Sequence, residues 1–463
     1  MKKPSLQYYC GHVGWLTMLM ISVFLSNAWS GMAELSGLGI RAQSLAGTGA
    51  ALSMDSSMSY YNPAGLADLQ FHDDLGFNVE LGTSFFDLNG YTKHSTNGRH
   101  SPRGLDCATG INFGLEFDLG RHVDEYIGGR DFVLGASVLV PTDSLYWWRI
   151  TFPQDEIYTF YYDDTHRIVA VIGAGFEVFD WLSIGASANL MLELETDSIG
   201  QLYISEESLR EILSGLGDDV NDDYVIVEGN LGEDQKTKIV CSPILGVQLK
   251  PIKNLVLGFT YRGEQYLDDY GINIVHIKVL PEIGAPVSIN FAYDHHFAHY
   301  YTPVQWAAGI SYRFAGGFLI GADVTFMEWS TFLDAFHREP TPHFKDIYVP
   351  RIGIEKCVLK GWAIGTARHA DLIIRAGYAF WESPIPEQRG DTNYLDNNKH
   401  IIALGGELSL DRIAGCWRKP VSIQLMGQYH HLIERTCTKE ATRDVLKFGG
   451  YAYTAGISLD FAF

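Results

Sequence analysis

The fold is decided by the stretch LSIGASANLMLEL, residues 182–194, in which apolar residues alternate with small or polar ones. The apolar phase begins at Leu182 and recurs at every second position up to Leu194. A period of two is that of a β-strand, whose successive side chains point to opposite faces. An ordinary strand has about five or six residues, and a tilted strand that crosses a bilayer needs about nine to eleven. The length of this stretch therefore favours a membrane barrel over a soluble sheet.

The same alternation recurs along the chain and predicts an all-β fold, a 14-stranded antiparallel transmembrane β-barrel over residues 73–463. The connectors after even-numbered strands are mostly short and the others mostly long, as expected for periplasmic turns and extracellular loops. One more alternating stretch, 287–293, does not fit an even strand count, so we place it in an outside loop. The predicted strands are 74–88, 110–118, 131–141, 166–178, 181–197, 237–249, 254–268, 303–314, 317–330, 346–357, 370–382, 400–410, 420–433 and 450–463.

Both ends of the chain carry export and assembly signals. Lys2 and Lys3 precede an apolar stretch at 13–25, and Ala28-Trp29-Ser30 resembles a signal-peptidase site. We expect a signal peptide at residues 1–30, with a cut after Ala33 as the alternative. The last residue, Phe463, is aromatic, as in the final strand of outer-membrane barrels, and we expect it to act as the signal for the barrel-assembly machinery. The expected location is the bacterial outer membrane.

Composition excludes several other classes of protein. The 463 residues carry 34 Lys+Arg against 55 Asp+Glu, a formal charge of −21, which argues against nucleic-acid binding. No nucleophile elbow, zinc-protease helix or phosphate loop appears, so we expect no catalytic residue and no cofactor. Asp294-His295-His296 with His299 has spacing that a metal could use, but we expect a solvated loop there and no metal site.

The segment ahead of the first strand, residues 31–72, is rich in Gly, Ala and Ser and lacks long alternation. Small residues allow close backbone packing and turns. A fourteen-stranded barrel lies between small filled barrels and open porins, so a compact segment of this length can fold inside the lumen as a plug. We expect Asn62-Pro63-Ala64-Gly65 to gate it. Pro63 fixes one dihedral and Asn62 can bond to nearby backbone.

Four motifs, spread over the whole mature chain, resemble those of the FadL family of outer-membrane transporters of long-chain fatty acids and hydrocarbons. The resemblance implies a barrel plugged by an N-terminal hatch. It also implies passive entry of substrate from outside, a hatch shift, and sideways exit into the membrane at a kink in the third strand. The motifs are Gly39 to Leu66 with its Asn62-Pro63-Ala64, Trp329-Ser330-Thr331-Phe332 followed by Phe344-Lys345-Asp346, Ile374-Arg375-Ala376-Gly377-Tyr378 followed by Ser383-Pro384-Ile385-Pro386-Glu387, and the C-terminal strand.

The resemblance also points to individual residues. The lateral gate would lie at Pro141-Thr142-Asp143, because proline cannot donate to the strand ladder; the family often has glycine where Asp143 aligns. Fatty-acid members place a cation near the outer end of the fifth strand, where this chain is acidic. Arg338 and Lys345 are then the candidates for binding a substrate headgroup.

These observations leave more than one function open. The leading hypothesis is a monomeric, non-enzymatic transporter of hydrophobic small molecules, whose partners are its substrate, outer-membrane lipid and the assembly machinery, with no nucleic acid. Fatty acid and neutral hydrocarbon are equally open as substrates. The alternatives are a lipid-modifying barrel enzyme and a general diffusion porin.

Overall fold

The structure, a computed structural model, describes residues 36–69, 75–91, 106–142, 157–158, 160, 168–192, 200–202, 229–231, 239–279, 287–334, 337–364, 367–390, 392–411, 420–440, 443 and 445–462. The expected signal peptide, Asp143 and Phe463 lie outside this part of the chain. The side chains of His295, His296 and His299 are also outside it.

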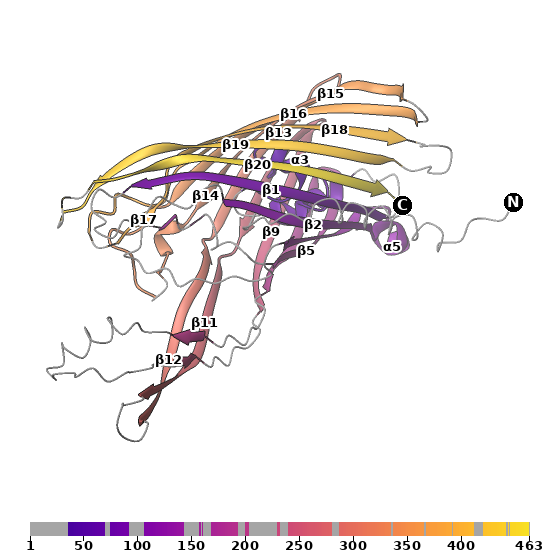
Figure 1. The fold of residues 1–463 in the computed structure, drawn as a ribbon. Coiled ribbons are helices and arrows are strands. Elements are labelled where there is room, and N and C mark those ends of the chain that lie inside the picture. The colour runs from indigo at the N-terminus through magenta and orange to yellow at the C-terminus, as the bar shows by residue number, and fades with distance from the viewer. Residues whose placement is uncertain are drawn as a thin grey trace.

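Fourteen strands form one closed barrel in which every neighbouring pair is antiparallel (Figure 1). The first strand pairs with the last, Leu81 opposite Ile457, and closes the barrel. The strands, in barrel order, are β1 (Leu75–Tyr91), β2 (Asp106–Asp118), β3 (Phe132–Pro141), β5 (Ile168–Phe179), β6 (Leu182–Leu192), β9 (Ile239–Ile252), β10 (Leu255–Arg262), β13 (Gln305–Arg313), β14 (Phe318–Met327), β15 (Ile347–Ile364), β16 (Ala367–Trp381), β18 (Lys399–Asp411), β19 (Val421–Thr438) and β20 (Val445–Ala462).

The remaining described elements are two-stranded sheets and short helices. Three two-stranded sheets pair β11 (Gln265–Val279) with β12 (Val287–Thr302), β7 (Gly200–Leu202) with β8 (Gly229–Leu231), and β4 (Ile157–Tyr158) with β17 (Tyr394–Leu395). Among the described residues, no helix has the length and apolarity to cross a membrane. The helices are α3 (Ile40–Ser44), α4 (Met58–Tyr61), η1 (Pro63–Asp68), α5 (Gly120–Ile127) and η3 (Trp329–Thr331).

Each of the fourteen predicted strands overlaps one barrel strand, and the 287–293 stretch lies outside the barrel, in β12, as predicted. Four predicted boundaries are wrong by five residues or more. Two of them fall short, because β19 runs on to Thr438 instead of 433 and β20 begins at Val445 instead of 450. The seventh strand ends at Arg262 instead of 268: Gly263 donates to the carbonyl of Pro243, which has no N–H to return the bond. The tenth strand continues past 357 to Ile364, because three register shifts against β16 carry it on after the alternation stops.

The outward face of the barrel is apolar and exposed. Leu404 is 62% exposed and Leu425 57%, whereas Ala403 and Met426, their inward-facing neighbours, are buried. Aromatic residues are also exposed on this face, among them Trp181, Trp306, Tyr378, Tyr451 and Tyr453. The alternation in the sequence is therefore apolar outward and small or polar inward, the reverse of a soluble sandwich.

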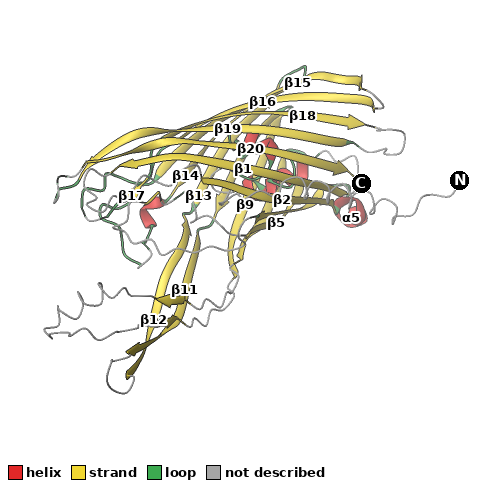
Figure 2. Ribbon diagram, viewed as in Figure 1, coloured by secondary structure: helices red, strands yellow, loops and turns green. Residues whose placement is uncertain are grey.

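The N-terminal segment, which we define as residues 36–69, contacts strands all around the barrel wall. η1 packs on β3, β5, β6 and β9, and α3 packs on β16, β18, β19 and β20. Figure 2 shows these short helices in red among the yellow strands. Four large apolar side chains of the segment, Leu38, Leu45, Met58 and Leu66, are at most 1% exposed.

Candidate functional site

Glycines on the wall let the N-terminal segment approach the strands closely. A Cβ added at any of several of them would come closer than 3.0 Å to an atom of the segment. At Gly185 and Gly258 the nearest atoms are backbone, those of Pro63 and Ala50. The same holds for Gly377 against Leu45, so the segment and wall touch without intervening side chains. Such glycines occur on most of the barrel strands, at Gly114, Gly135, Gly175, Gly185, Gly246, Gly258, Gly353, Gly377, Gly405 and Gly456.

Wall carboxylates accept hydrogen bonds from backbone N–H groups of the segment. Asp323 Oδ2 accepts from Gly49 N at 2.8 Å and from Ala50 N at 3.2 Å. Glu80 Oε1 accepts from Ile40 N at 3.2 Å. Glu116 accepts from the N–H of Ser56 in the same way. An irregular segment cannot pair its own backbone groups as a helix or sheet does, so the wall supplies the partners.

Side chains of the barrel wall donate hydrogen bonds to backbone carbonyls of the segment. Gln248 Nε2 donates to Leu52 O at 2.8 Å and Ser311 Oγ to Ala51 O at 2.6 Å. Gln428 Nε2 donates to Gln43 O at 2.8 Å and to Ser36 O at 3.2 Å. The segment is thus held in large part by side-chain hydrogen bonds, each worth about 0.5–1.5 kcal/mol net between neutral groups and about 1.5–3 kcal/mol to a charged group.

Asn62 and Pro63 join the two halves of the segment. Asn62 Oδ1 accepts from Ala64 N at 3.1 Å at the start of η1, where Pro63 occupies the first turn. Asn62 Nδ2 donates to Ala50 O at 2.6 Å and to Val247 O of β9 at 3.3 Å. All four residues from Asn62 to Gly65 are buried, and their gating role stays a prediction.

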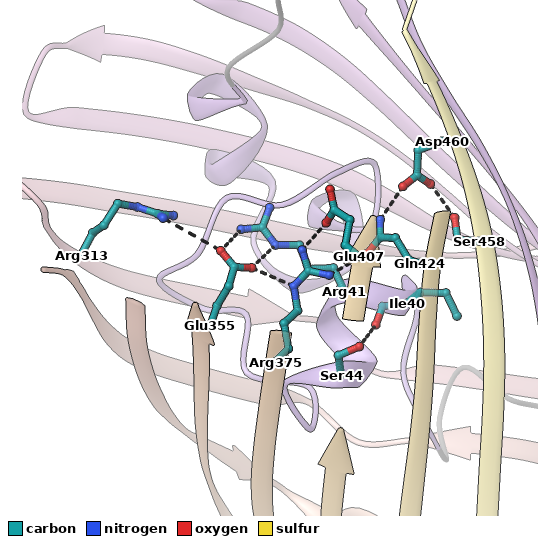
Figure 3. Close-up of polar contacts among 10 residues, drawn as sticks. All are labelled: Ile40, Arg41, Ser44, Arg313, Glu355, Arg375, Glu407, Gln424, Ser458 and Asp460. Carbon is teal, nitrogen blue, oxygen red and sulfur yellow. Dashed lines mark hydrogen bonds and ion pairs between the residues drawn. The ribbon is translucent and has the colours of Figure 1, made fainter. Parts of the chain in front are cut away.

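Charged and polar side chains of α3 and six strands form a network inside the barrel, which we call the ionic cluster (Figure 3). Its centre is Glu355 of β15, which accepts bonds from Arg41 of α3 and from Arg375 of β16. Arg375 also bonds Glu407 and Gln424, so its guanidinium is paired on both sides. The members are Arg41, Arg313, Glu355, Arg375, Glu407, Gln424, Ser458 and Asp460.

A second group of cations surrounds Trp381, at the end of β16. Lys399 Nζ lies 4.8 Å from the centre of the Trp381 ring, and Arg351 Cζ lies 5.7 Å from it. Lys399 is 4% exposed, and Trp381 packs on the buried cluster that contains Ala46 of the segment. The segment, an aromatic ring and two cations therefore meet in one place.

Of the two predicted headgroup residues, Lys345 lies near this place, since its ion-pair partner Glu382 directly follows Trp381. Lys345 is exposed and pairs with Glu382, Nζ to Oε1 at 2.5 Å. Arg338 is also exposed, and its backbone N–H donates to Asp334 Oδ1 at 2.8 Å. Whether either residue meets a substrate stays a prediction.

At the predicted lateral gate, Pro141 is the last residue of β3 and is buried. Pairing with β2 continues there, with Gly110 opposite Pro141, and Thr142 N donates to Thr109 O at 3.1 Å. The last described pair between β3 and β5 is Leu139 opposite Val169, and the residues just ahead of Ile168 in β5 lie outside the described part of the chain. Since Asp143 lies outside the described residues, the gate stays a prediction.

Sequence reasoning missed the inward-facing charges. Glu80, Asp323, Glu355 and Arg375 occupy the small or polar phase of their strands, where charge is unexpected unless it is paired. A search for charged residues in that phase would have found them. Among the described side chains, no group of three or more His, Cys, Asp or Glu could hold a metal ion.

The fold and this site define a class of protein, a closed antiparallel barrel of fourteen strands whose N-terminal segment contacts the inward face of its wall. No family model matches the sequence, and no curated protein matches it. Solved structures do match.

One is a FadL homologue of Pseudomonas aeruginosa, with a TM-score of 0.57, 13% identity, 94% of this chain covered and 99% of that one. Another is the toluene transporter TodX of P. putida, with a TM-score of 0.54, 17% identity, and coverage of 93% and 99%. A deltaS2S3 mutant of TodX, described as a monoaromatic hydrocarbon channel, has a TM-score of 0.56 at 17% identity, with coverage of 93% and 100%. The chain shares the FadL-type fold of these proteins.

Proposed function

We propose that this chain is a FadL-family transporter of the bacterial outer membrane that lets hydrophobic small molecules diffuse across it. One observation carries the proposal: the fold of hydrocarbon channels is combined here with an N-terminal segment bound to the inner wall on many sides. The apolar outward face supports burial in lipid. The neighbours are a FadL homologue and a toluene transporter, so long-chain fatty acids and hydrocarbons are the substrate classes to test.

In this proposal residues 31–72 form the hatch. The wall holds the described part, 36–69, through glycine contacts, side-chain hydrogen bonds and the ion pairs of Arg41 with Glu355 and of Asp68 with Lys250. Such contacts can break and re-form one at a time, which suits an element that shifts when substrate arrives. The substrate then leaves sideways beside Pro141, which cannot donate to the strand ladder at the end of β3.

The test is deletion of residues 34–66. In liposomes the deleted barrel should leak small sugars, and in cells it should lose specific uptake of a long-chain fatty acid and of toluene. The full-length chain, reconstituted in equal amount, is the control, and circular dichroism checks that the barrel has formed. A correctly folded deletion variant with unchanged leakage and unchanged uptake would rule out the hatch.

A further inference from the structure

Glu355 lies between three arginines that belong to different elements. Arg41, on the N-terminal segment, binds it as a fork, Nε to Oε2 at 2.9 Å and Nη2 to Oε1 at 3.0 Å. Arg375, on the wall, donates from Nε to the same Oε2 at 2.8 Å. Arg313, also on the wall, places Nη1 4.0 Å from Oε1, within ion-pair range but beyond hydrogen-bond range. Figure 3 shows all three around the carboxylate.

The three arginines differ in how free they are to move. Arg375 is 1% exposed and is bound to Glu407 and Gln424 as well, so it stays with the wall. The Arg41 side chain is 18% exposed and moves with α3. The Arg313 side chain is 49% exposed, so it has room to change rotamer. The Glu355 side chain is only 5% exposed, which makes loss of a partner costly.

We propose that Glu355 exchanges partners during the transport cycle: it binds Arg41 while the segment is seated, and Arg313 once the segment has moved. The inference rests on the proposed hatch. Glu355 Oε1 is the oxygen shared by the two arginines, so the exchange needs one rotamer change of Arg313 and no movement of the strands. Without it, departure of Arg41 would take two hydrogen bonds from a carboxylate that is only 5% exposed and leave it the bond from Arg375.

The exchange makes the ion pair a two-position switch. Arg41 stabilises the seated position of the segment and Arg313 the moved position. Each arginine is hydrogen-bonded to Glu355 in only one of the two positions. Removing Arg41 therefore shifts the equilibrium toward the moved position of the segment, and removing Arg313 shifts it toward the seated position. A charge-assisted bond of this kind changes the ratio of the two positions by about tenfold or more.

The experiment compares Arg41→Gln with Arg313→Gln in liposomes and in uptake assays. Arg41→Gln should raise sugar leakage about tenfold. Arg313→Gln should leave leakage unchanged and lower uptake of the hydrophobic probe about tenfold. Lys356→Gln is the matched control, because Lys356 is also a strand cation near Glu355 but bonds Gly316 O. It should change neither quantity.

Coupling through the carboxylate is tested by repeating Arg313→Gln in a Glu355→Gln chain. There Arg313→Gln should have no further effect, since the shared acceptor is neutral. If Arg313→Gln lowers uptake equally in both backgrounds, or leaves it unchanged in the natural one, the exchange is wrong. Leakage after deletion of 34–66 tests the hatch separately, so a failed exchange with a leaking deletion would leave the proposed function standing.

Discussion

Single glycines decide how closely the N-terminal segment can sit. Gly258→Ala and Gly377→Ala would each put a methyl group into segment backbone, at Ala50 and Leu45. We expect each change to cost about 1–3 kcal/mol as overpacking, and to displace the segment rather than the hydrogen-bonded wall. Protease cleavage of the segment and sugar leakage in liposomes should both rise. Gly427→Ala is the control, because its Cβ would have 4.0 Å to the nearest atom.

The Asn62 side chain makes three hydrogen bonds to backbone groups, all of which are lost when it is truncated. Asn62→Ala leaves the carbonyl of Ala50 and the N–H of Ala64 without this partner in a buried place. Each buried group left unpaired costs about 1–3 kcal/mol, so amide exchange in 62–69 should accelerate clearly. Ser53→Ala, which removes one marginal bond of 3.5 Å to Gln248, should change exchange little. Equal exchange rates in the two variants would contradict this role for Asn62.

At the scale of elements, the loop between β16 and β18 is held by two cations, Arg435 of β19 and Lys439 directly after β19. Lys439 Nζ donates to the carbonyls of Gln388, Gly390 and Thr392, at 2.5, 3.1 and 2.5 Å. Arg435 Nη1 donates to those of Ile385 and Asp396, at 2.8 and 2.7 Å.

Lys439→Met should therefore release the loop, with faster proteolysis between 387 and 393 and an intact barrel. Lys447→Met, which removes only an exposed ion pair with Glu434, should have no such effect. A loop equally resistant to protease in both variants would show that Lys439 does not hold it.

The strands could be predicted because a membrane wall imposes alternation over lengths that few soluble strands reach. The wrong predictions for the ends of the seventh and tenth strands have local causes. Pro243 ends pairing beyond Arg262, and register shifts carry β15 past the point where alternation stops. Period-two reasoning cannot detect either, because both depend on the neighbouring strand.

The candidate site was less predictable. The Asn62 region could be chosen from composition and resemblance, because small residues and a turn pair mark it. The wall residues that bond the segment could not be predicted in this way. Arg41 and Glu355, for example, are more than 300 positions apart in sequence and meet only in the closed barrel. Local patterns carry no information on such pairs.

For the molecule as a whole, the apolar outer face makes lipid part of its stability. Leu404→Arg places a charge on the outward, apolar face of β18, where Leu404 is 62% exposed. It should lower the free energy of unfolding in vesicles by about 2–4 kcal/mol if the site lies near the bilayer midplane. Urea titration of the reconstituted barrel measures this. His343→Arg, in a loop with 63% side-chain exposure, is the control and should be neutral. A neutral Leu404→Arg would argue against burial of this face in lipid.

The close fit of the segment also dictates an order of assembly. The barrel closes where β1 meets β20, so the seam joins residues near the beginning of the chain to its very end. The segment makes contacts too close for a methyl group with strands from β2, at Gly114, to β20, at Gly456, so the full set of contacts exists only after β20 has joined the sheet. We therefore expect the N-terminal segment to lie against the forming sheet during assembly. The barrel would then close around the segment when β20 pairs with β1.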